Sequence, residues 1–440
     1  MSAQIVFVTL FLGLVAGTQP VALQVSGPVH LVRVILDGRE VAAMTQPPWR
    51  TSVDLGRDLL PRELTAVGFD GRGDEIARAT QILNLPRPTA EFEIVLERGA
   101  GDAITGATLK WRHLTNAQPD RVTMSLDGKP LKVDPKFHVP LPKLDVNTPH
   151  VIAADLHFED GFLARRELVI ESIRSDSVGT QLTPILLRET APKHPAKWDG
   201  CLADAKGTPV RIAAVEKPRA VVIFVRDPDP YEVEKALTPT MRLRAGTPND
   251  YLKRMVQLDR DTYGRFLWPV AQRFANDDDT ASLLFPPSVD VDLSATGVLW
   301  LLLKHYGDGD AHDEPRQFTD AVAVGGLKGV TGSQRRAVVF ILSSQTDTSR
   351  YAPAVVRRYL QSVGVPLFVW SLTGPQPDLA PSWGEVEDIS NVVKLGLAVR
   401  RVRDALAGQR VAWVDVDPLA ALRLKANGDC GVEPVARVAR

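Results

Sequence analysis

The chain of 440 residues lacks several features that would point to a class of function. Lys and Arg total 52, Asp and Glu total 53, and the net charge is -1, so the chain has no general attraction for nucleic acid. No apolar run reaches the roughly 20 residues that cross a bilayer, so we expect no integral membrane segment in the mature protein. The hydrophobic share of 44% and the charged share of 24% are those of an ordinary folded protein.

Signatures of catalysis are missing as well. The sequence contains no His-Glu-x-x-His, no Gly-x-Ser-x-Gly and no Gly-x-x-x-x-Gly-Lys-Ser/Thr phosphate loop. The acidic run at 276–280 does not have the alternating spacing of a calcium-binding loop. Carboxylates surround His312 within residues 308–314, which makes that segment the better candidate for metal or acid–base chemistry, although a polar surface loop is favoured.

Cysteine is almost absent, with Cys201 and Cys430 as its two occurrences. Two cysteines so far apart are not a disulfide framework, and neither has the context of a metal ligand or a nucleophile. In an exported protein they can form one bridge that ties the C-terminal tail to the segment entering the last domain. Two unrelated buried thiols are the equal alternative.

Residues 5–17 form an apolar run near the N-terminus. The run is too short to span a bilayer, but it has the length of the apolar core of a secretory signal, and residues 15–17 are small enough for cleavage. We therefore predict a signal peptide over 1–17, a mature chain beginning near Thr18, and a periplasmic or secreted protein. No Lys or Arg precedes the run, and the alternatives are a first β-strand of the next domain or a start codon assigned too late.

Between residues 21 and 170 the apolar residues mostly alternate, which is the pattern of strands with one buried face. One such strand at 32–36 leads into Asp37-Gly38, a dipeptide that favours a tight hairpin. The same pattern returns 90 residues later, as an alternating strand at 122–126 followed by Asp127-Gly128. The repeat predicts two small immunoglobulin-like β-sandwiches in tandem.

The second half of the chain has a different pattern. Apolar runs that do not alternate occur at 220–225, 337–342 and 366–372. Such runs are typical of strands that are buried on both faces of a parallel sheet. Helical patterns occur at 299–305, 351–363 and 392–406. The helix between the last two strands completes a βαβ unit, and the whole half predicts one doubly wound α/β domain.

The expected fold class is therefore multidomain, with two all-β sandwiches followed by an α/β domain. The predicted order is a signal peptide at 1–17, β-sandwiches at 18–86 and 87–174, a β connector at 175–217, the α/β domain at 218–425 and a C-terminal tail at 426–440.

The segment 337–372 resembles the later half of a von Willebrand factor A-type domain. Residues 338–348 are similar to the strand and loop that in such domains end in Ser-Asp-Gly-x-Asp, and 318–322 resembles the Leu-x-Asp-Ala-Leu helix before that strand. Two β-sandwiches ahead of such a domain resemble the bacterial von Willebrand factor A-related exported proteins. The resemblance implies a head domain that recognises a partner at the C-terminal edge of its sheet.

Domains of this family often hold a divalent metal at that edge through an Asp-x-Ser-x-Ser loop, a Thr and a later Asp. This sequence keeps the first Asp, as Asp227, but has Arg316 at the Thr position and Ser344 at the third position. Asp347 matches a family Asp that is not a ligand. The resemblance implies a degenerate site without metal, in which Arg316 pairs with Asp227 or Asp229 in place of the cation. A weak residual metal site is the alternative.

These observations together favour a non-enzymatic exported protein that binds another protein, as an adhesin or a scaffold, without a cofactor. The α/β domain would be the recognition head and the sandwiches its stalk. The residues expected at the binding edge are Asp227, Asp229, Arg316, Ser344 and Asp347. The alternative function is a metal-dependent hydrolase that uses the acidic and histidine residues at 308–314 with Asp227.

Overall fold

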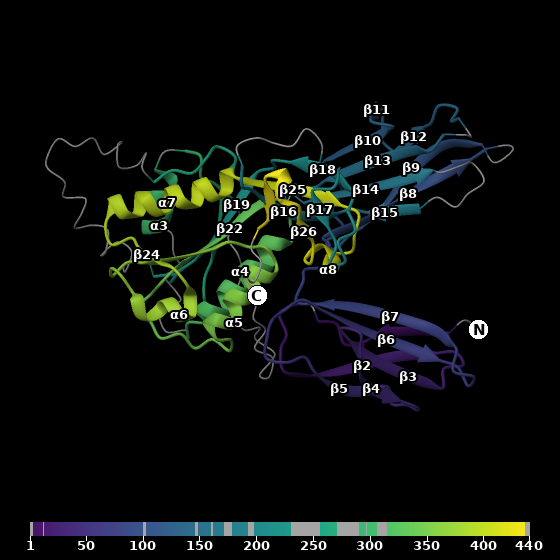
Figure 1. Ribbon diagram of the computed structural model, residues 1–440, viewed down its shortest axis with the longest axis horizontal. Helices are drawn as coiled ribbons and strands as arrows, with labels where there is room; N and C mark the ends of the chain where they lie inside the picture. The colour runs from purple at the N-terminus through teal and green to yellow at the C-terminus, as the bar shows by residue number, and fades with distance from the viewer. Residues whose placement is uncertain are drawn as a thin grey trace.

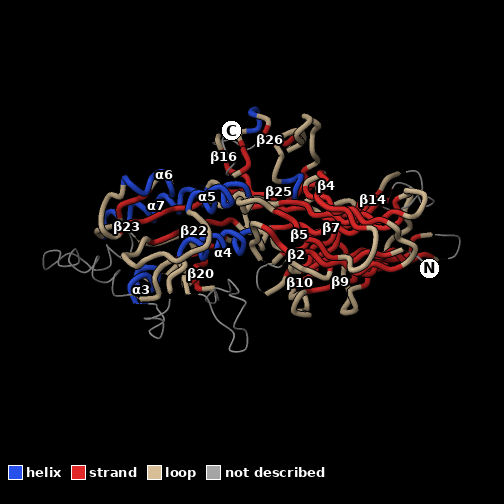
Figure 2. Tube along the Cα trace, turned by 90° about the horizontal axis from the view of Figure 1, so that it is seen from below, coloured by secondary structure: helices blue, strands red, loops and turns tan. Residues whose placement is uncertain are grey.

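The computed structural model describes residues 3–11, 13–99, 103–145, 148–159, 162–170, 178–191, 198–229, 256–270, 290–295, 297–305 and 315–435. Within these ranges the chain forms two β-sandwiches, a small four-stranded sheet and an α/β unit (Figure 1). Figure 2 shows that strands fill one half of the molecule and that the helices gather in the other half. None of the described helices is long and apolar enough to cross a membrane.

The first sandwich packs the sheet β1-β2-β5 against the sheet β4-β3-β6-β7. Its strands are β1 (Gln4–Phe7), β2 (Thr18–Ser26), β3 (Leu31–Leu36), β4 (Arg39–Met44), β5 (Arg50–Asp54), β6 (Arg62–Phe69) and β7 (Glu75–Leu83). Alternate residues point inward, so that Val32 and Val34 of β3 are fully buried with Leu64 of β6.

The second sandwich repeats this arrangement with the sheets β12-β9-β8 and β11-β10-β13-β14-β15. Its strands are β8 (Ala90–Arg98), β9 (Ile104–His113), β10 (Arg121–Leu126), β11 (Lys129–Leu131), β12 (His138–Pro140), β13 (His150–His157), β14 (Leu163–Ile170) and β15 (Val178–Gln181). Its core is separate from that of the first sandwich. The predicted tandem of β-sandwiches is therefore confirmed.

The two Asp-Gly hairpins are equivalent in detail. Asp37 and Asp127 have φ values of 50° and 49°, and the glycine after each also has a positive φ, as a two-residue hairpin turn requires. The Asp37 carboxylate accepts the Glu63 N–H at 2.9 Å, and the Asp127 carboxylate accepts the Val151 N–H at 2.8 Å. Each aspartate thus joins its turn to the start of the next strand in the sheet, which explains why both copies keep the same residue there.

Residues 4–7 form a strand of the first sandwich in this structure. Strand β1 pairs antiparallel with β2, and Ile5 and Phe7 are 5% and 7% exposed in the core. Strand β1 has the same place in its sheet, next to β2, that β8 has next to β9 in the second sandwich. This packing agrees with the alternative role of a first strand. Cleavage near Thr18 stays a prediction, and an experiment below addresses it.

A small sheet of order β18-β25-β16-β27 connects the second sandwich to the α/β unit. Its members are β16 (Thr183–Glu189), β18 (Ile212–Glu216), β25 (Gln409–Val414) and β27 (Val432–Pro434), with β17 (Leu202–Ala203), β26 (Lys425–Ala426), α8 (Pro418–Ala421) and the 3-10 turn η4 (Gly428–Cys430) beside it. Strands from before and after the α/β unit pair directly in this sheet. The connector expected at 175–217 and the tail expected at 426–440 therefore share one β-structure instead of forming two separate segments.

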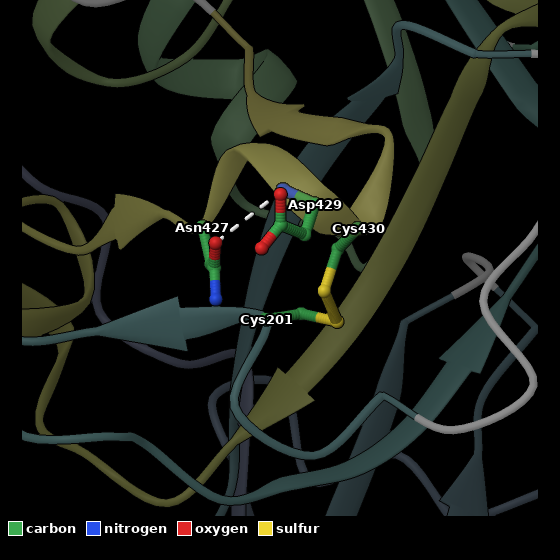
Figure 3. The surroundings of a disulfide bond; sticks show 4 residues. All are labelled: Cys201, Asn427, Asp429 and Cys430. Carbon is green, nitrogen blue, oxygen red and sulfur yellow. Dashed lines mark hydrogen bonds between the residues drawn. A yellow bond between two sulfur atoms is a disulfide. The ribbon is translucent and has the colours of Figure 1, made fainter.

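A disulfide bond joins Cys201 to Cys430, which decides between the two sequence interpretations (Figure 3). Cys201 has no exposed surface and packs in the core of the small sheet. Its carbonyl accepts the Asn427 N–H at 2.9 Å, and the Asn427 side chain accepts the Asp429 N–H at 3.3 Å. The bridge spans 229 residues and closes the base of the α/β unit.

We expect the double substitution Cys201→Ser and Cys430→Ser to lower the free energy of unfolding by about 2–4 kcal/mol. The bridge closes a long loop, so its loss increases the conformational entropy of the unfolded chain. Guanidinium unfolding followed by tryptophan fluorescence measures the change. Reduced wild-type protein is the control, and it should unfold at the same guanidinium concentration as the double variant. Equal unfolding midpoints for oxidised wild type and the double variant would show that the disulfide does not stabilise the fold.

The α/β unit is a six-stranded sheet of order β21-β20-β19-β22-β23-β24, parallel except for the edge strand β21. Its strands are β19 (Ala220–Val225), β20 (Thr262–Leu267), β21 (Val291–Asp292), β22 (Arg335–Ile341), β23 (Leu367–Ser371) and β24 (Val386–Asp388). Its helices are α3 (Val298–His305), α4 (Phe318–Val330), α5 (Pro353–Ser362), α6 (Ala380–Trp383) and α7 (Val392–Ala407), with the 3-10 turn η3 (Pro377–Leu379).

Helices cover both faces of this sheet (Figure 1). Helices α3 and α7 pack on one face, around Phe224 and Trp370, and α4 and α5 pack on the other, around Ile223 and Phe340. Every residue of β19 and β22 is buried, which is why their sequences do not alternate. The predicted doubly wound α/β arrangement is present, and the strand order changes direction beside β19, at whose carboxyl end sheets of this kind usually bind ligands.

Candidate binding edge of the alpha/beta unit

The carboxyl ends of β19 and β22 and the start of α4 meet at one end of the sheet, and we call this region the carboxyl edge. It contains Asp227, Asp229, Arg316, Ser343 and Asp347. Asp227 follows β19 by two residues, and Arg316 precedes α4 by the same number. The edge forms because parallel strands end on the same side of a sheet and the helix after them begins there.

An ion pair between Asp227 and Arg316 is the centre of the carboxyl edge. Arg316 Nε lies 3.3 Å from Asp227 Oδ2, and both side chains are about 5% exposed. The pairing that the resemblance implied is therefore present. The Asp229 N–H donates to Asp227 Oδ1 at 3.0 Å, so both carboxylate oxygens already accept hydrogen bonds.

The serine at this edge is Ser343, one residue before the expected one. Ser343 Oγ donates to Asp227 Oδ2 at 3.2 Å and also accepts the Gln345 N–H at 3.1 Å. Ser344 is exposed and lies next to this hydrogen-bonded turn. Ser343, and not Ser344, therefore contacts Asp227 at the third position of the site, because β22 ends at Ile341 and the chain turns there.

Asp347 caps the first turn of α4. Its carboxylate accepts the Phe318 N–H at 3.0 Å and the Thr319 N–H at 3.2 Å, two of the donors that a helix start leaves without partners. Gln317, at the cap position itself, makes no side-chain cap hydrogen bond. Asp347 thus supplies a cap from a distant loop, and the Thr348 N–H adds a bond to the Arg316 carbonyl at 2.7 Å.

Asp320 stabilises the end of the loop that carries Asp347, just before α5. It has no exposed surface, and its carboxylate accepts the N–H groups of Arg350 at 3.0 Å and Tyr351 at 3.1 Å. Burial raises the pKa of Asp320, while these two hydrogen bonds act in the opposite direction. The acidic groups of the edge therefore build the loops and cap the helix.

A second guanidinium lies beneath Asp227. Arg226 has no exposed surface, donates to the Asp227 carbonyl at 2.7 Å, and stacks its guanidinium 5.1 Å from the centre of the Trp268 ring. Burial lowers the pKa of Arg226 to about 10, which still leaves it protonated at neutral pH. Sequence reasoning missed this residue, although a charged residue directly after an apolar strand was a visible signal.

The described residues contain no group of three or more His, Cys, Asp or Glu side chains placed to hold a metal ion. The charges at the carboxyl edge agree with this, because Arg226 and Arg316 both lie beside Asp227 and would repel a divalent cation. The segments 276–280 and 308–314 lie outside the described residues, so the alternative that uses His312 is not addressed by this geometry.

The chain combines two tandem β-sandwiches with a doubly wound α/β unit whose carboxyl edge carries a buried ion pair. No known protein family and no curated protein matches the sequence. Among solved structures, fibronectin(III)-like modules of CbhA from Clostridium thermocellum are 10% identical over 19% of this chain and 99% of their own, with a TM-score of 0.16.

Two further solved structures are similarly low in sequence identity and in TM-score. The central fibronectin-III array of RIM-binding protein is 12% identical over 44% of this chain and 81% of its own, with a TM-score of 0.21. A β-glycosidase from Bacteroides vulgatus is 10% identical over 39% of this chain and 25% of its own, with a TM-score of 0.24. Scores this low carry no argument, and the assignment of the sandwiches rests on the strand pairing of this chain.

Proposed function

We propose that this chain is a non-enzymatic exported protein that binds a partner protein through the carboxyl edge of a von Willebrand factor A-like head. The observation that carries the proposal is the buried ion pair between Asp227 and Arg316. A guanidinium in this place neutralises the aspartate without an open coordination position. Recognition at this edge is therefore independent of magnesium.

Export is supported by the disulfide between Cys201 and Cys430. Structural disulfides persist in oxidising compartments such as the periplasm and the extracellular space, and they are rare in the cytosol. This argument does not depend on the role of residues 1–17. We propose a periplasmic or secreted location on this ground.

The surface for the partner is the exposed rim above the ion pair. Ser344 and Asp347 are exposed there, whereas Asp227 and Arg316 below them are buried. The loop that carries both exposed residues is held by the Asp320 and Asp347 hydrogen bonds, so it presents a defined shape to a partner. The two sandwiches act as a stalk in this proposal.

Affinity capture from the native envelope tests the proposal. Captured partner should be the same in chelator and in added magnesium, and the variant Ser344→Arg should lose it, because a long cation then covers the rim. The matched control is Ser52→Arg, on the exposed face of β5 in the first sandwich, which should capture as wild type does. Capture that fails in chelator and returns with magnesium would contradict the proposal, and so would unchanged capture by Ser344→Arg.

A further inference from the structure

A cavity of about 570 Å³ lies where the linker between the sandwiches, the small sheet and the α/β unit meet. Its wall is largely apolar and includes Leu85 and Pro86 of the linker, Leu182 and Trp413 of the small sheet, and Val363 at the end of α5. This volume is within the range of small-molecule sites, roughly 300–1,000 Å³, and junctions between domains are their frequent location. The cavity is at the amino end of the parallel strands, opposite the carboxyl edge.

One buried cation lines this cavity. Arg336, the second residue of β22, is 6% exposed, and its backbone is held by Gln409, whose side chain both accepts from and donates to it at 2.9 and 3.0 Å. The guanidinium donates to the carbonyls of Gly364 at 3.4 Å and Val363 at 3.5 Å. Both distances exceed those of ordinary hydrogen bonds, so these contacts compensate the charge weakly.

Among the described residues, no carboxylate forms an ion pair with Arg336. Burial lowers the pKa of Arg336 to about 10, and no acidic side chain counters that effect. Tyr359 lies near Arg336 and could balance its charge only as a phenolate. Burial raises the pKa of Tyr359, so its phenol is neutral at physiological pH. A protonated guanidinium without a counter-charge is costly to bury, and an anion bound in the cavity would offset that cost.

The other charged groups of the wall are less buried than Arg336. Arg165 lines the cavity too, but Asp155 and Glu216 already neutralise it at 2.6 and 2.9 Å. Arg87, Glu91 and Asp417 line the cavity at exposed positions, and Asp415 lines it at a half-buried position. Arg336 is thus the buried cation of this wall, and no carboxylate of the described residues pairs with it.

We propose that this cavity binds a small amphipathic molecule with a single carboxylate, whose head pairs with Arg336 and whose apolar body lies against Leu182 and Trp413. A guanidinium forms two parallel hydrogen bonds with a carboxylate, and one negative charge balances one arginine. The apolar wall excludes water from the remainder of the ligand. This site is independent of the partner-binding edge, so either proposal can fail without the other.

Calorimetric titration of the full-length protein with decanoate, and separately with decan-1-ol, tests the inference. Decanoate should bind, and decan-1-ol of the same chain length should bind at least about 10-fold more weakly because it cannot replace the charge-assisted hydrogen bonds. The substitution Arg336→Met should lower decanoate affinity about 10- to 100-fold. The control Arg403→Met, at a partly exposed arginine of α7, should bind decanoate as wild type does.

A second variant and a second measurement test the inference even when the Arg336→Met variant does not fold. Ser362→Trp places a ring into the cavity from the end of α5 without removing a charge, and decanoate binding should be lost. Quenching by 2-bromodecanoate reports the location, since it should be strong in wild type and reduced in Trp413→Phe. Absence of decanoate binding to wild type, equal binding of decan-1-ol, or unchanged affinity in Arg336→Met would each overturn the inference.

Discussion

Replacing Arg316 with alanine is expected to lower the free energy of unfolding by about 3–5 kcal/mol. The reason is that Asp227, which is about 5% exposed, then keeps its charge in a buried place without the guanidinium that lies 3.3 Å away. Hydrogen bonds from Ser343 and from the Asp229 N–H remain, but neither carries a positive charge. The Arg226 guanidinium also remains, and it donates to the Asp227 carbonyl instead of the carboxylate. Urea unfolding followed by circular dichroism measures the loss.

A double-mutant cycle isolates the pair from the other effects of the substitution. The variant carrying both Asp227→Ala and Arg316→Ala should be more stable than the sum of the two single losses predicts, because neither charge is left alone. Arg403→Ala, at a partly exposed arginine of α7, is the matched control and should change stability by less than about 0.5 kcal/mol. A loss under about 1 kcal/mol for Arg316→Ala would show that the buried pair does not hold the carboxyl edge together.

Removal of residues 1–17 is expected to destabilise the first sandwich by roughly 5–10 kcal/mol, which is comparable with the whole stability of a small domain. Ile5 and Phe7 would leave the core, and each buried apolar side chain contributes about 1.5–3 kcal/mol. Denaturant unfolding of the protein that begins at Thr18 measures the effect, and a deletion of residues 1–3 is the control.

Hydrogen bonds to two buried side-chain amides also predict that removing residues 1–17 destabilises the first sandwich. Gln81 accepts the Phe11 N–H at 3.1 Å, and Asn84 accepts the Val15 N–H at 2.7 Å and donates to the Val15 carbonyl at 2.9 Å. Both amides are 5% exposed or less, so the deletion leaves each without these partners at a cost of about 1–3 kcal/mol.

N-terminal sequencing of the protein from the native envelope decides between the two roles of this segment. The packing of β1 favours a protein that still contains residues 4–17. A mature chain that starts near Thr18 and unfolds at the same denaturant concentration as the full chain would contradict the structural role and confirm the predicted signal peptide.

The N-terminal run shows why the local pattern leaves two roles open for this segment. Val6 of β1, and Val8 and Leu10 just after it, are 45%, 61% and 50% exposed, so apolar residues lie on both sides of this segment and the alternation is lost. A run without alternation at the start of a chain has the same composition as the apolar core of a signal. The pairing with β2 and the hydrogen bond of Phe11 to Gln81 of β7 favour the strand, and N-terminal sequencing decides between the two roles.

Local sequence patterns were enough to predict those strands, helices and turns whose signals lie between neighbouring residues. Alternation around Val32 and Val34, the Asp-Gly turns at Asp37 and Asp127, and the unbroken apolar run of β19 each follow from which faces are buried or from which residues accept positive φ. These are properties of neighbouring residues, and they were correctly predicted.

Contacts that join distant segments are visible in the folded chain and not in its local patterns. The pairing of β16 with β25 and β27, the bond between Cys201 and Cys430, and the use of Ser343 instead of Ser344 depend on where separate loops end in space. The cap that Asp347 provides for α4 has the same origin. Periodicity has no information about such contacts, because loops between strands have no repeating geometry and long-range pairing is selected by the packing of the whole core.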